Sequence, residues 1–293
     1  MHNSLQCLCL KKIPTFTPNC HSMKPAFLLL SILLSAFTSG AAQSPPLLCG
    51  HRGGFEGNLP ENSLSRFDGV AKAFGDEVFM VELDVRESSD GRLFVLHDDT
   101  LERTTNGQGK IAETPSRTLK KLLQKDKSGK LTSERLLRWD KALQWLVKHP
   151  NARFMVDIKG DIHQKVIQRI QHYRLEAQCL ILTFSPRHSE LVAKLTSKAL
   201  ISSLVSSESD WDKIRQLNIP PHQQVIYVND KTPLPLIAEM KKTGVAITAD
   251  VSESNKNQHS AFPKAHYSHL VAEKMVDILI TDFPVEVMGY FLR

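Results

Sequence analysis

The feature that most constrains this chain is the alternation of short apolar runs with segments of helical periodicity. Apolar runs with the length of buried strands occupy 47–50, 78–85, 93–97, 154–159, 179–184, 200–205, 224–228, 245–248 and 277–281. Between some of them, segments 62–74, 134–148 and 162–176 place apolar residues at the spacing of one helix face. Strands and helices that alternate along the whole chain predict a parallel α/β fold.

The strand count favours a hairpin near residue 90. A closed barrel of this class needs eight strands, but the sequence offers one more. Asp90-Gly91 is a turn signal, and it joins two runs that are too close together for a helical crossover. If this hairpin has a two-residue loop, Asp84 lies opposite His97 and both side chains point to one face. Periodicity alone leaves a closed barrel and an open sheet both possible. Residues 103–135 are expected to form a surface excursion with a short helix at 117–124.

The N-terminal segment, residues 1–42, has the features of a signal peptide. Met23-Lys24 offers a second start, which we favour, and an apolar run over 26–37 leads to small residues at 39–42. That run is shorter than the roughly 20 residues needed to cross a bilayer. We therefore expect cleavage after Ala42, no membrane span afterwards, a secreted or periplasmic protein, and a single domain over 47–293.

Charge argues against a nucleic-acid-binding protein. The chain has a formal net charge of +6, and residues 1–42 carry three lysines and no acid, so cleavage leaves +3. No run of Lys and Arg with interleaved aromatic residues follows.

Cys49 and Cys179 are the cysteines that remain after this cleavage. In an eight-stranded barrel they would lie about 15 Å apart across it, beyond the roughly 7 Å that a disulfide tolerates, so we expect free thiols.

Charged residues and histidines gather where the predicted strands end. His51-Arg52 follows the first strand, and Glu82 and Asp84 end the second. His97-Asp98 follows the hairpin arm, and Asp157-Ile158-Lys159 ends another strand. The carboxyl ends of parallel barrel strands meet on one face, where the active site is built. The sequence therefore predicts that these side chains share one pocket.

The three carboxylates Glu82, Asp84 and Asp157 indicate a divalent cation. Crowded carboxylates repel one another unless a cation lies between them, and hard oxygen ligands select Ca²⁺ or Mg²⁺. The alternative is that Glu82 and Asp84 lie on a solvated strand face. The apolar residues beside them indicate that the strand is buried on its other face too, which favours a metal or catalytic use.

The two histidines suit phosphodiester cleavage. Taken singly, His51 and His97 could each be a hydrogen-bonded structural histidine. Together with the carboxylates, one could remove a proton from a nucleophile while the other protonates the leaving alkoxide. Arg52 and Lys159 could offset negative charge on the phosphoryl oxygens.

The order of these motifs resembles the glycerophosphodiester phosphodiesterase family over roughly residues 47–286. The resemblance is carried by His51-Arg52, Pro60-Glu61-Asn62, Glu82-Leu83-Asp84, Asp90-Gly91-Arg92, His97-Asp98, the segment 103–109, Asp157-x-Lys159 and Ile280-Thr281-Asp282-Phe283-Pro284. It implies a TIM-type (β/α)8 barrel of the phospholipase-C-like phosphodiesterase type. It also implies metal-dependent hydrolysis of glycerophosphodiesters, as small-molecule substrates, to glycerol 3-phosphate and an alcohol.

The same resemblance implies roles for individual residues. The family's catalytic histidines match His51, as the base that activates a glycerol hydroxyl, and His97, as the acid. Its phosphate-binding residues match Arg52 and Lys159, and its metal ligands match Glu82, Asp84 and Asp157. Glu61 and Asn62 belong to a family motif without an assigned role.

Two departures from the family pattern bear on the substrate. Asp157 replaces the usual glutamate and is one methylene shorter, and Ile247-Thr248-Ala249-Asp250 lacks the tryptophan that usually helps to form the glycerol pocket. The alternative that the protein hydrolyses another lipid or sugar phosphodiester therefore stays open. A protein that binds phosphodiesters on the same barrel without turnover also stays open.

Overall fold

The computed structural model of the chain describes residues 44–55 and 57–291. The predicted signal peptide, 1–42, lies outside these residues. Within the described part, none of the helices has the length and apolar character needed to cross a membrane.

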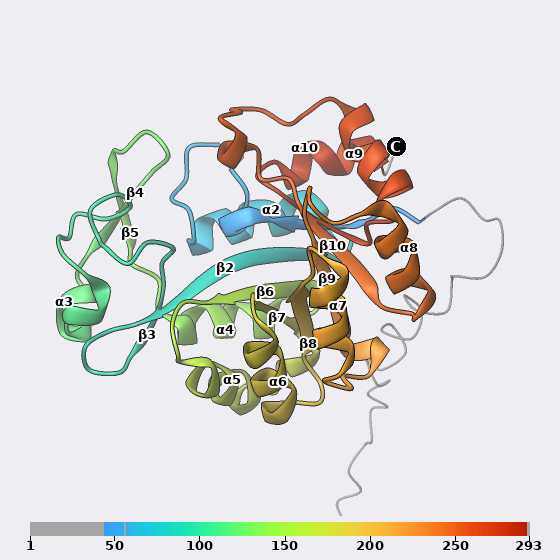
Figure 1. Ribbon diagram of the computed structural model, residues 1–293. Coiled ribbons are helices and arrows are strands. Elements are labelled where there is room, and N and C mark those ends of the chain that lie inside the picture. The colour runs from blue at the N-terminus through green and yellow to red at the C-terminus, as the bar shows by residue number, and fades with distance from the viewer. Residues whose placement is uncertain (1–43, 56, 292–293) are drawn as a thin grey trace, which may run out of the picture. The chain divides into compact units, whose positions relative to one another are not determined.

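Eight parallel strands form a closed barrel (Figure 1). In chain order they are β1 (Leu47–Gly50), β2 (Phe79–Glu87), β6 (Ala152–Ile158), β7 (Cys179–Thr183), β8 (Leu200–Leu204), β9 (Gln224–Val228), β10 (Ala246–Asp250) and β11 (Ile278–Thr281). Each pairs with the next, and β1 pairs with both β11 and β2, which closes the ring. The TIM-type barrel is thereby confirmed, and closure, which periodicity had left open, is decided.

Helices pack around the outside of the barrel (Figure 1). They are α2 (Leu64–Phe74), α4 (Trp139–Lys148), α5 (His163–His172), α6 (Pro186–Leu195), α7 (Glu208–Arg215), α8 (Leu234–Lys242), α9 (Lys264–Glu273) and α10 (Pro284–Phe291). The Ser63 side chain accepts a hydrogen bond from Arg66 N and so caps α2. The largest apolar core lies between strands and helices, with Phe67, Trp139 and Phe154 fully buried.

The surplus strand is a hairpin arm, as predicted. β3 (Leu93–Val95) runs antiparallel to β2. The predicted register is wrong by one residue, because Leu96 N donates to Asp84 O at 2.9 Å and places Leu96 opposite Asp84. The loop spans 88–92 rather than two residues, and within it Ser88 N donates to Arg92 O at 2.9 Å and Gly91 N donates to Ser88 O at 3.0 Å. The Asp90 carboxylate accepts a hydrogen bond from Ser116 N at 2.8 Å, which anchors the loop to the following segment.

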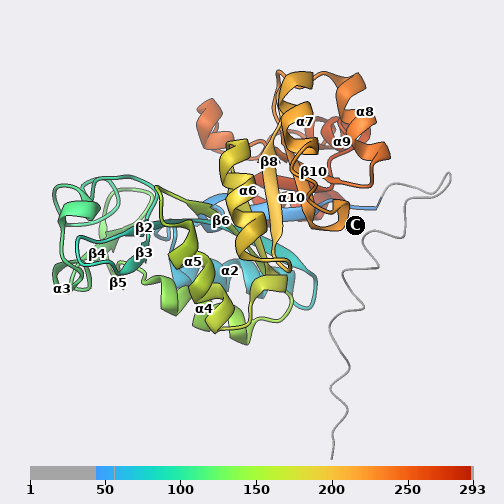
Figure 2. The same cartoon turned by 60° about the horizontal axis from the view of Figure 1, so that its bottom comes forward.

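The excursion after β3 carries more strand structure than expected. α3 covers only Ser116–Leu119, so the helix predicted over 117–124 is wrong beyond residue 119. β4 (Leu123–Lys125) pairs antiparallel with β5 (Leu131–Arg135). Because β5 extends to Arg135, α4 begins at Trp139 and not at residue 134, where the predicted helical segment began. Figures 1 and 2 show this small sheet and α3 at one side of the barrel. The excursion has its own apolar cluster of Phe94, Leu96, Leu101, Ile111, Leu119 and Leu136.

The two cysteines within the described residues, Cys49 and Cys179, are buried free thiols, as predicted. Cys49 lies on β1 and Cys179 on β7, and the ring order places β2 and β6 between these strands on the shorter path.

Candidate active site

The chain makes a tight turn where β1 ends, and this turn buries His51. A Cβ atom on Gly50 would come within 3.0 Å of Gly54 N, so the close approach of the two backbone segments requires glycine there. Arg52 has a left-handed backbone, with φ of 49°, and its N–H donates to Glu82 Oε2 at 2.8 Å. The turn therefore brings the His51-Arg52 pair against the carboxylates of β2.

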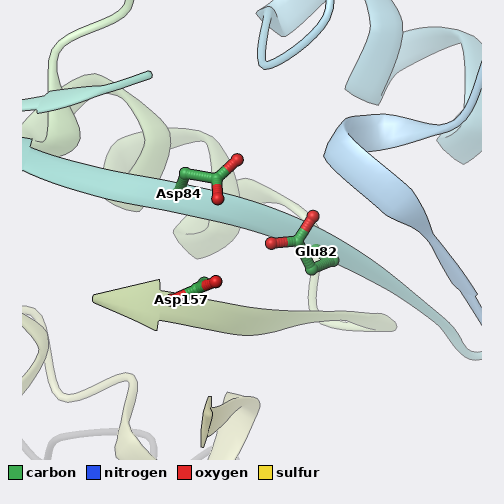
Figure 3. Close-up of side chains that lie close together, drawn as sticks. All are labelled: Glu82, Asp84 and Asp157. Carbon is green, nitrogen blue, oxygen red and sulfur yellow. The ribbon is translucent and has the colours of Figure 1, made fainter. Parts of the chain in front are cut away.

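The three predicted metal ligands converge. Glu82 and Asp84 lie on β2, and Asp157 lies on β6 directly beside Asp84 in the strand register. Each contributes a carboxylate oxygen, and these oxygens all lie within 4.8 Å of one another. Figure 3 shows the three carboxylate groups grouped over the two strands. Glu82 and Asp84 are buried, so water screens their mutual repulsion poorly.

Electrostatics within this carboxylate cluster favour a cation. Burial raises the pKa of Glu82 to about 8, and the charge of Asp84 adds to this rise. Burial also raises the pKa of Asp157. Lys159 Nζ lies 2.6 Å from Asp157 Oδ2 and 3.1 Å from Asp84 Oδ1. Burial by itself would raise the pKa of Asp84, but the charge of Lys159 and smaller contributions from other neighbours, among them the hydrogen bond from Asn62, together lower it. Lys159 carries one positive charge, which is less than the three carboxylates require. Their donor atoms are all oxygens, and such a set fits Ca²⁺ or Mg²⁺.

His51 contacts the buried carboxylate of Asp282, a residue for which no role was predicted from the sequence. Its Nδ1 lies 2.8 Å from Asp282 Oδ1, which leaves Nε2 as the nitrogen available for proton exchange. Burial lowers the pKa of His51, but the hydrogen bond to Asp282 and the charges of Glu82 and Asp250 outweigh it and raise that pKa to about 9. The Ile280-Thr281-Asp282 motif was the signal that could have identified this partner.

His97 has a similar partner in a more open setting. Its Nδ1 lies 2.8 Å from Asp98 Oδ1, and Arg103 Nε holds the other Asp98 oxygen at 2.5 Å. The His97 side chain is 35% exposed, against 10% for His51. Leu96 N donates to Asp84 O at 2.9 Å, so the next residue, His97, lies beside the carboxylate cluster although the hairpin register differs from the predicted one.

Glu61 and Asn62 hold other members of the site in place. Asn62 Nδ2 donates to Asp84 Oδ2 at 3.0 Å. Glu61 accepts two hydrogen bonds of 2.8 Å from Arg103 and lies 3.4 Å from Arg52 Nη1. Among the residues that the structure describes, Arg52 Nε is a buried donor without a hydrogen-bond partner. Such a donor suits an anionic ligand.

At the end of β10, the segment that lacks the family's usual tryptophan, Asp250 contacts an aromatic side chain of the neighbouring strand β9. Asp250 Oδ2 accepts a hydrogen bond from Tyr227 Oη at 3.2 Å. The ring of Tyr227 meets Phe184 edge to face at 6.1 Å between centroids, and Phe184 is exposed. Tyr227 and Phe184 were not singled out from the sequence, because neither lies in a motif.

The sequence matches the glycerophosphoryl diester phosphodiesterase family over residues 51–286. A glycerophosphodiester phosphodiesterase of Caldanaerobacter subterraneus subsp. tengcongensis is 32% identical over 146 residues, which are 47% of this chain and 58% of that protein. The alignment thus spans less than two thirds of that relative.

Solved structures share the fold over most of the chain. A glycerophosphoryl diester phosphodiesterase from Parabacteroides distasonis has a TM-score of 0.74 at 24% identity, and the match covers 89% of this chain and 90% of that one. An Oleispira antarctica phosphodiesterase, solved with the product sn-glycerol-3-phosphate, has a TM-score of 0.65 at 19% identity, covering 85% of this chain and 97% of that one. At these identities the likeness shows the barrel.

Proposed function

This chain belongs to the glycerophosphoryl diester phosphodiesterase family, and from this premise we propose that it hydrolyses glycerophosphodiesters to glycerol 3-phosphate and an alcohol. The observation that carries the proposal is the meeting of Glu82, Asp84 and Asp157 within 4.8 Å at the strand ends. Both histidines and Lys159 lie around this cluster. The Oleispira antarctica relative, which holds sn-glycerol-3-phosphate as its product, supports this choice of substrate.

We propose that Glu82, Asp84 and Asp157 hold Ca²⁺ or Mg²⁺. When bound, such a cation would polarise the phosphoryl group and offset the charge that develops there. It would also replace Lys159 as the counter-charge of Asp84 and Asp157. Lys159 Nζ and the unpartnered Nε of Arg52 would then be free to bind phosphoryl oxygens.

His51 is proposed as the base that takes a proton through Nε2 from the glycerol hydroxyl next to the ester. That hydroxyl attacks phosphorus and the alcohol leaves, which gives a cyclic glycerol phosphate that water then opens to glycerol 3-phosphate. Asp282, bound to Nδ1, fixes the imidazole orientation and stabilises the imidazolium that forms. A base must be neutral, and a cation on Glu82 would offset a charge that raises the pKa of His51. His97 is proposed as the acid that protonates the departing alkoxide, and its more exposed position suits an alcohol that leaves to solvent.

Export remains a proposal that rests on the sequence of residues 1–42 alone. A basic start, a short apolar run and small residues before Gln43 favour a secreted or periplasmic protein.

The direct test of the function is release of glycerol 3-phosphate from glycerophosphocholine by the purified protein with Ca²⁺ or Mg²⁺. Choline and glycerol 3-phosphate should form in equal amounts. Inositol and glycerol phosphodiesters, offered separately, would establish which alcohols can leave. Binding of glycerophosphocholine without product would instead indicate the non-catalytic alternative.

Asp157→Glu tests the third ligand, because it restores the side chain that the family usually has at this position. We expect the variant to fold and its affinity for Ca²⁺ or Mg²⁺ to hold or rise, since the carboxylate gains reach toward Glu82 and Asp84. Titration calorimetry of the two proteins measures this directly. A large loss of cation affinity would show that the pocket is built around the shorter side chain or that Asp157 is not a ligand.

A further inference from the structure

The buried carboxylate of Glu253 contacts Asp282, the partner of His51, through the backbone N–H of Asp282. It begins the short 3-10 helix η5 (Glu253–Lys256) after β10, and its side chain is fully buried. Glu253 Oε1 accepts hydrogen bonds from the Tyr267 hydroxyl and, at 2.7 Å, from the Thr281 hydroxyl. Glu253 Oε2 accepts a hydrogen bond of 2.7 Å from Asp282 N. The three donors come from α9, β11 and the residue that holds His51.

Within the described part of the chain, Glu253 has no cationic partner to offset its charge. None of the ion pairs among residues 44–55 and 57–291 includes it. A buried charge without a counter-ion is costly unless hydrogen bonds satisfy it. Burial raises the pKa of Glu253, and the hydrogen bonds from Tyr267, Thr281 and Asp282 oppose that rise. An apolar side chain would avoid this cost, so the carboxylate needs an explanation.

The contacts of Asp282 supply that explanation. Residues 253 and 254 hold both its backbone and its side chain, since Asp282 N donates to Glu253 and Ser254 N donates to Asp282 Oδ2 at 2.6 Å. The other carboxylate oxygen of Asp282 binds His51. Glu253 is itself fixed by Tyr267, whose hydroxyl accepts a hydrogen bond from Phe262 N at 2.8 Å. The position of Asp282 therefore depends on a network that does not touch the reacting groups.

We propose that Glu253 is a positioning residue, which fixes Asp282 and through it the orientation and tautomer of the His51 imidazole. The inference rests on the proposed function in one respect, namely that His51 transfers a proton. Glu253 touches neither the carboxylate cluster nor the phosphate-binding residues in the contacts described above. Its removal should therefore lower kcat and leave KM and cation affinity close to their original values.

Glu253→Gln is the sharpest single change, because it keeps the shape and removes one acceptor. If the amide nitrogen faces Asp282 N–H, two donors oppose each other. If it faces the two hydroxyls, it meets oxygens that already accept hydrogen bonds from Phe262 N and Phe283 N, at 2.8 and 3.1 Å. Either orientation leaves a buried donor unsatisfied. We expect kcat to fall by about 10²-fold, the loss typical of a misplaced catalytic group.

The deciding measurement is a double-mutant cycle with Asp282→Asn. Alone, Asp282→Asn should lower kcat by about 10²–10⁴-fold, as loss of a histidine-orienting carboxylate does. In that background Glu253→Gln should change kcat by no more than about twofold, because its effect passes through Asp282. If the two losses multiply instead, Glu253 does not act through Asp282 and the proposal is wrong.

Asp277→Asn is the matched control for a general loss of stability. Asp277 precedes β11 at the opposite end of this strand, and its carboxylate also accepts a backbone hydrogen bond, from Ile247 N at 2.6 Å, besides binding Lys241. This variant should lower Tm but leave kcat unchanged. Equal loss of kcat in Glu253→Gln and Asp277→Asn, at equal loss of Tm, would overturn the proposal.

A readout independent of turnover separates this inference from the proposed function. Nitrogen-15 NMR of the His51 ring in the cation-loaded protein should show protonated Nδ1 in the unmodified chain and a changed signal in both Glu253→Gln and Asp282→Asn. If the unmodified protein hydrolyses no glycerophosphodiester, the proposed function fails, and the NMR comparison alone decides the inference. An unaltered His51 signal in Glu253→Gln would refute it.

Discussion

Removal of divalent cations with EDTA is expected to lower phosphodiesterase activity by at least about 10³-fold, the scale of several kcal/mol of charge stabilisation. The physical reason lies in this chain's own charges. Among the described residues, Lys159 is the side chain that forms ion pairs with this cluster, and its pairing with Asp84 and Asp157 keeps it from the phosphate. Activity measured before EDTA treatment, after it, and after return of Ca²⁺ or Mg²⁺ tests this expectation, and full activity in excess EDTA would contradict it.

Asp84→Ala should reproduce the loss of activity in the presence of saturating cation. It removes the central carboxylate together with the groups that Asn62 and Lys159 contact. Glu87→Ala is the matched control, because Glu87 lies on the same strand but forms a partly exposed pair with Lys165. Such pairs contribute little to stability. Circular dichroism should show both variants folded, and only Asp84→Ala should lose activity and cation binding.

His51→Ala and His97→Ala are each expected to lower kcat by about 10²–10⁴-fold, the usual contribution of an acid or base. His51→Ala also leaves the buried Asp282 carboxylate without its imidazole partner, so this variant should be the less stable of the two. His172→Ala, in the last turn of α5, is a control for loss of a histidine at the opposite end of the barrel. Near-normal turnover by either catalytic variant would make that histidine structural.

A substrate with an activated leaving group separates the two roles. With a p-nitrophenyl ester of glycerol 3-phosphate, departure of the alcohol needs no acid, but the glycerol hydroxyl still needs a base. His97→Ala should then regain most of its activity, and His51→Ala should not. The reverse pattern would exchange the two assignments.

Much of the site could be predicted because its residues lie in short motifs at strand ends. Parallel strands present their carboxyl ends on one face, so Glu82, Asp84, Asp157 and Lys159 follow from the order of elements alone. The resemblance supplied the barrel and the pairing of His51 with His97. The hairpin register was not predicted correctly, because Asp90-Gly91 indicates a turn but not its length. In the structure Ser88 N donates to Arg92 O at 2.9 Å and Gly91 has a φ of 78°, so the loop is longer than two residues.

Periodicity and short motifs are local properties, so they predict the elements, their parallel order and the chemistry of the groups at the strand ends. Which groups orient the others depends on contacts between distant parts of the chain. His51 and Asp282 are 231 residues apart and meet because β1 and β11 close the ring. Glu253 lies in no motif, and its importance comes from burial among donors of three separate segments. Closure of a barrel is a long-range property, and no local pattern encodes the contacts that Asp282 makes with His51 and Glu253.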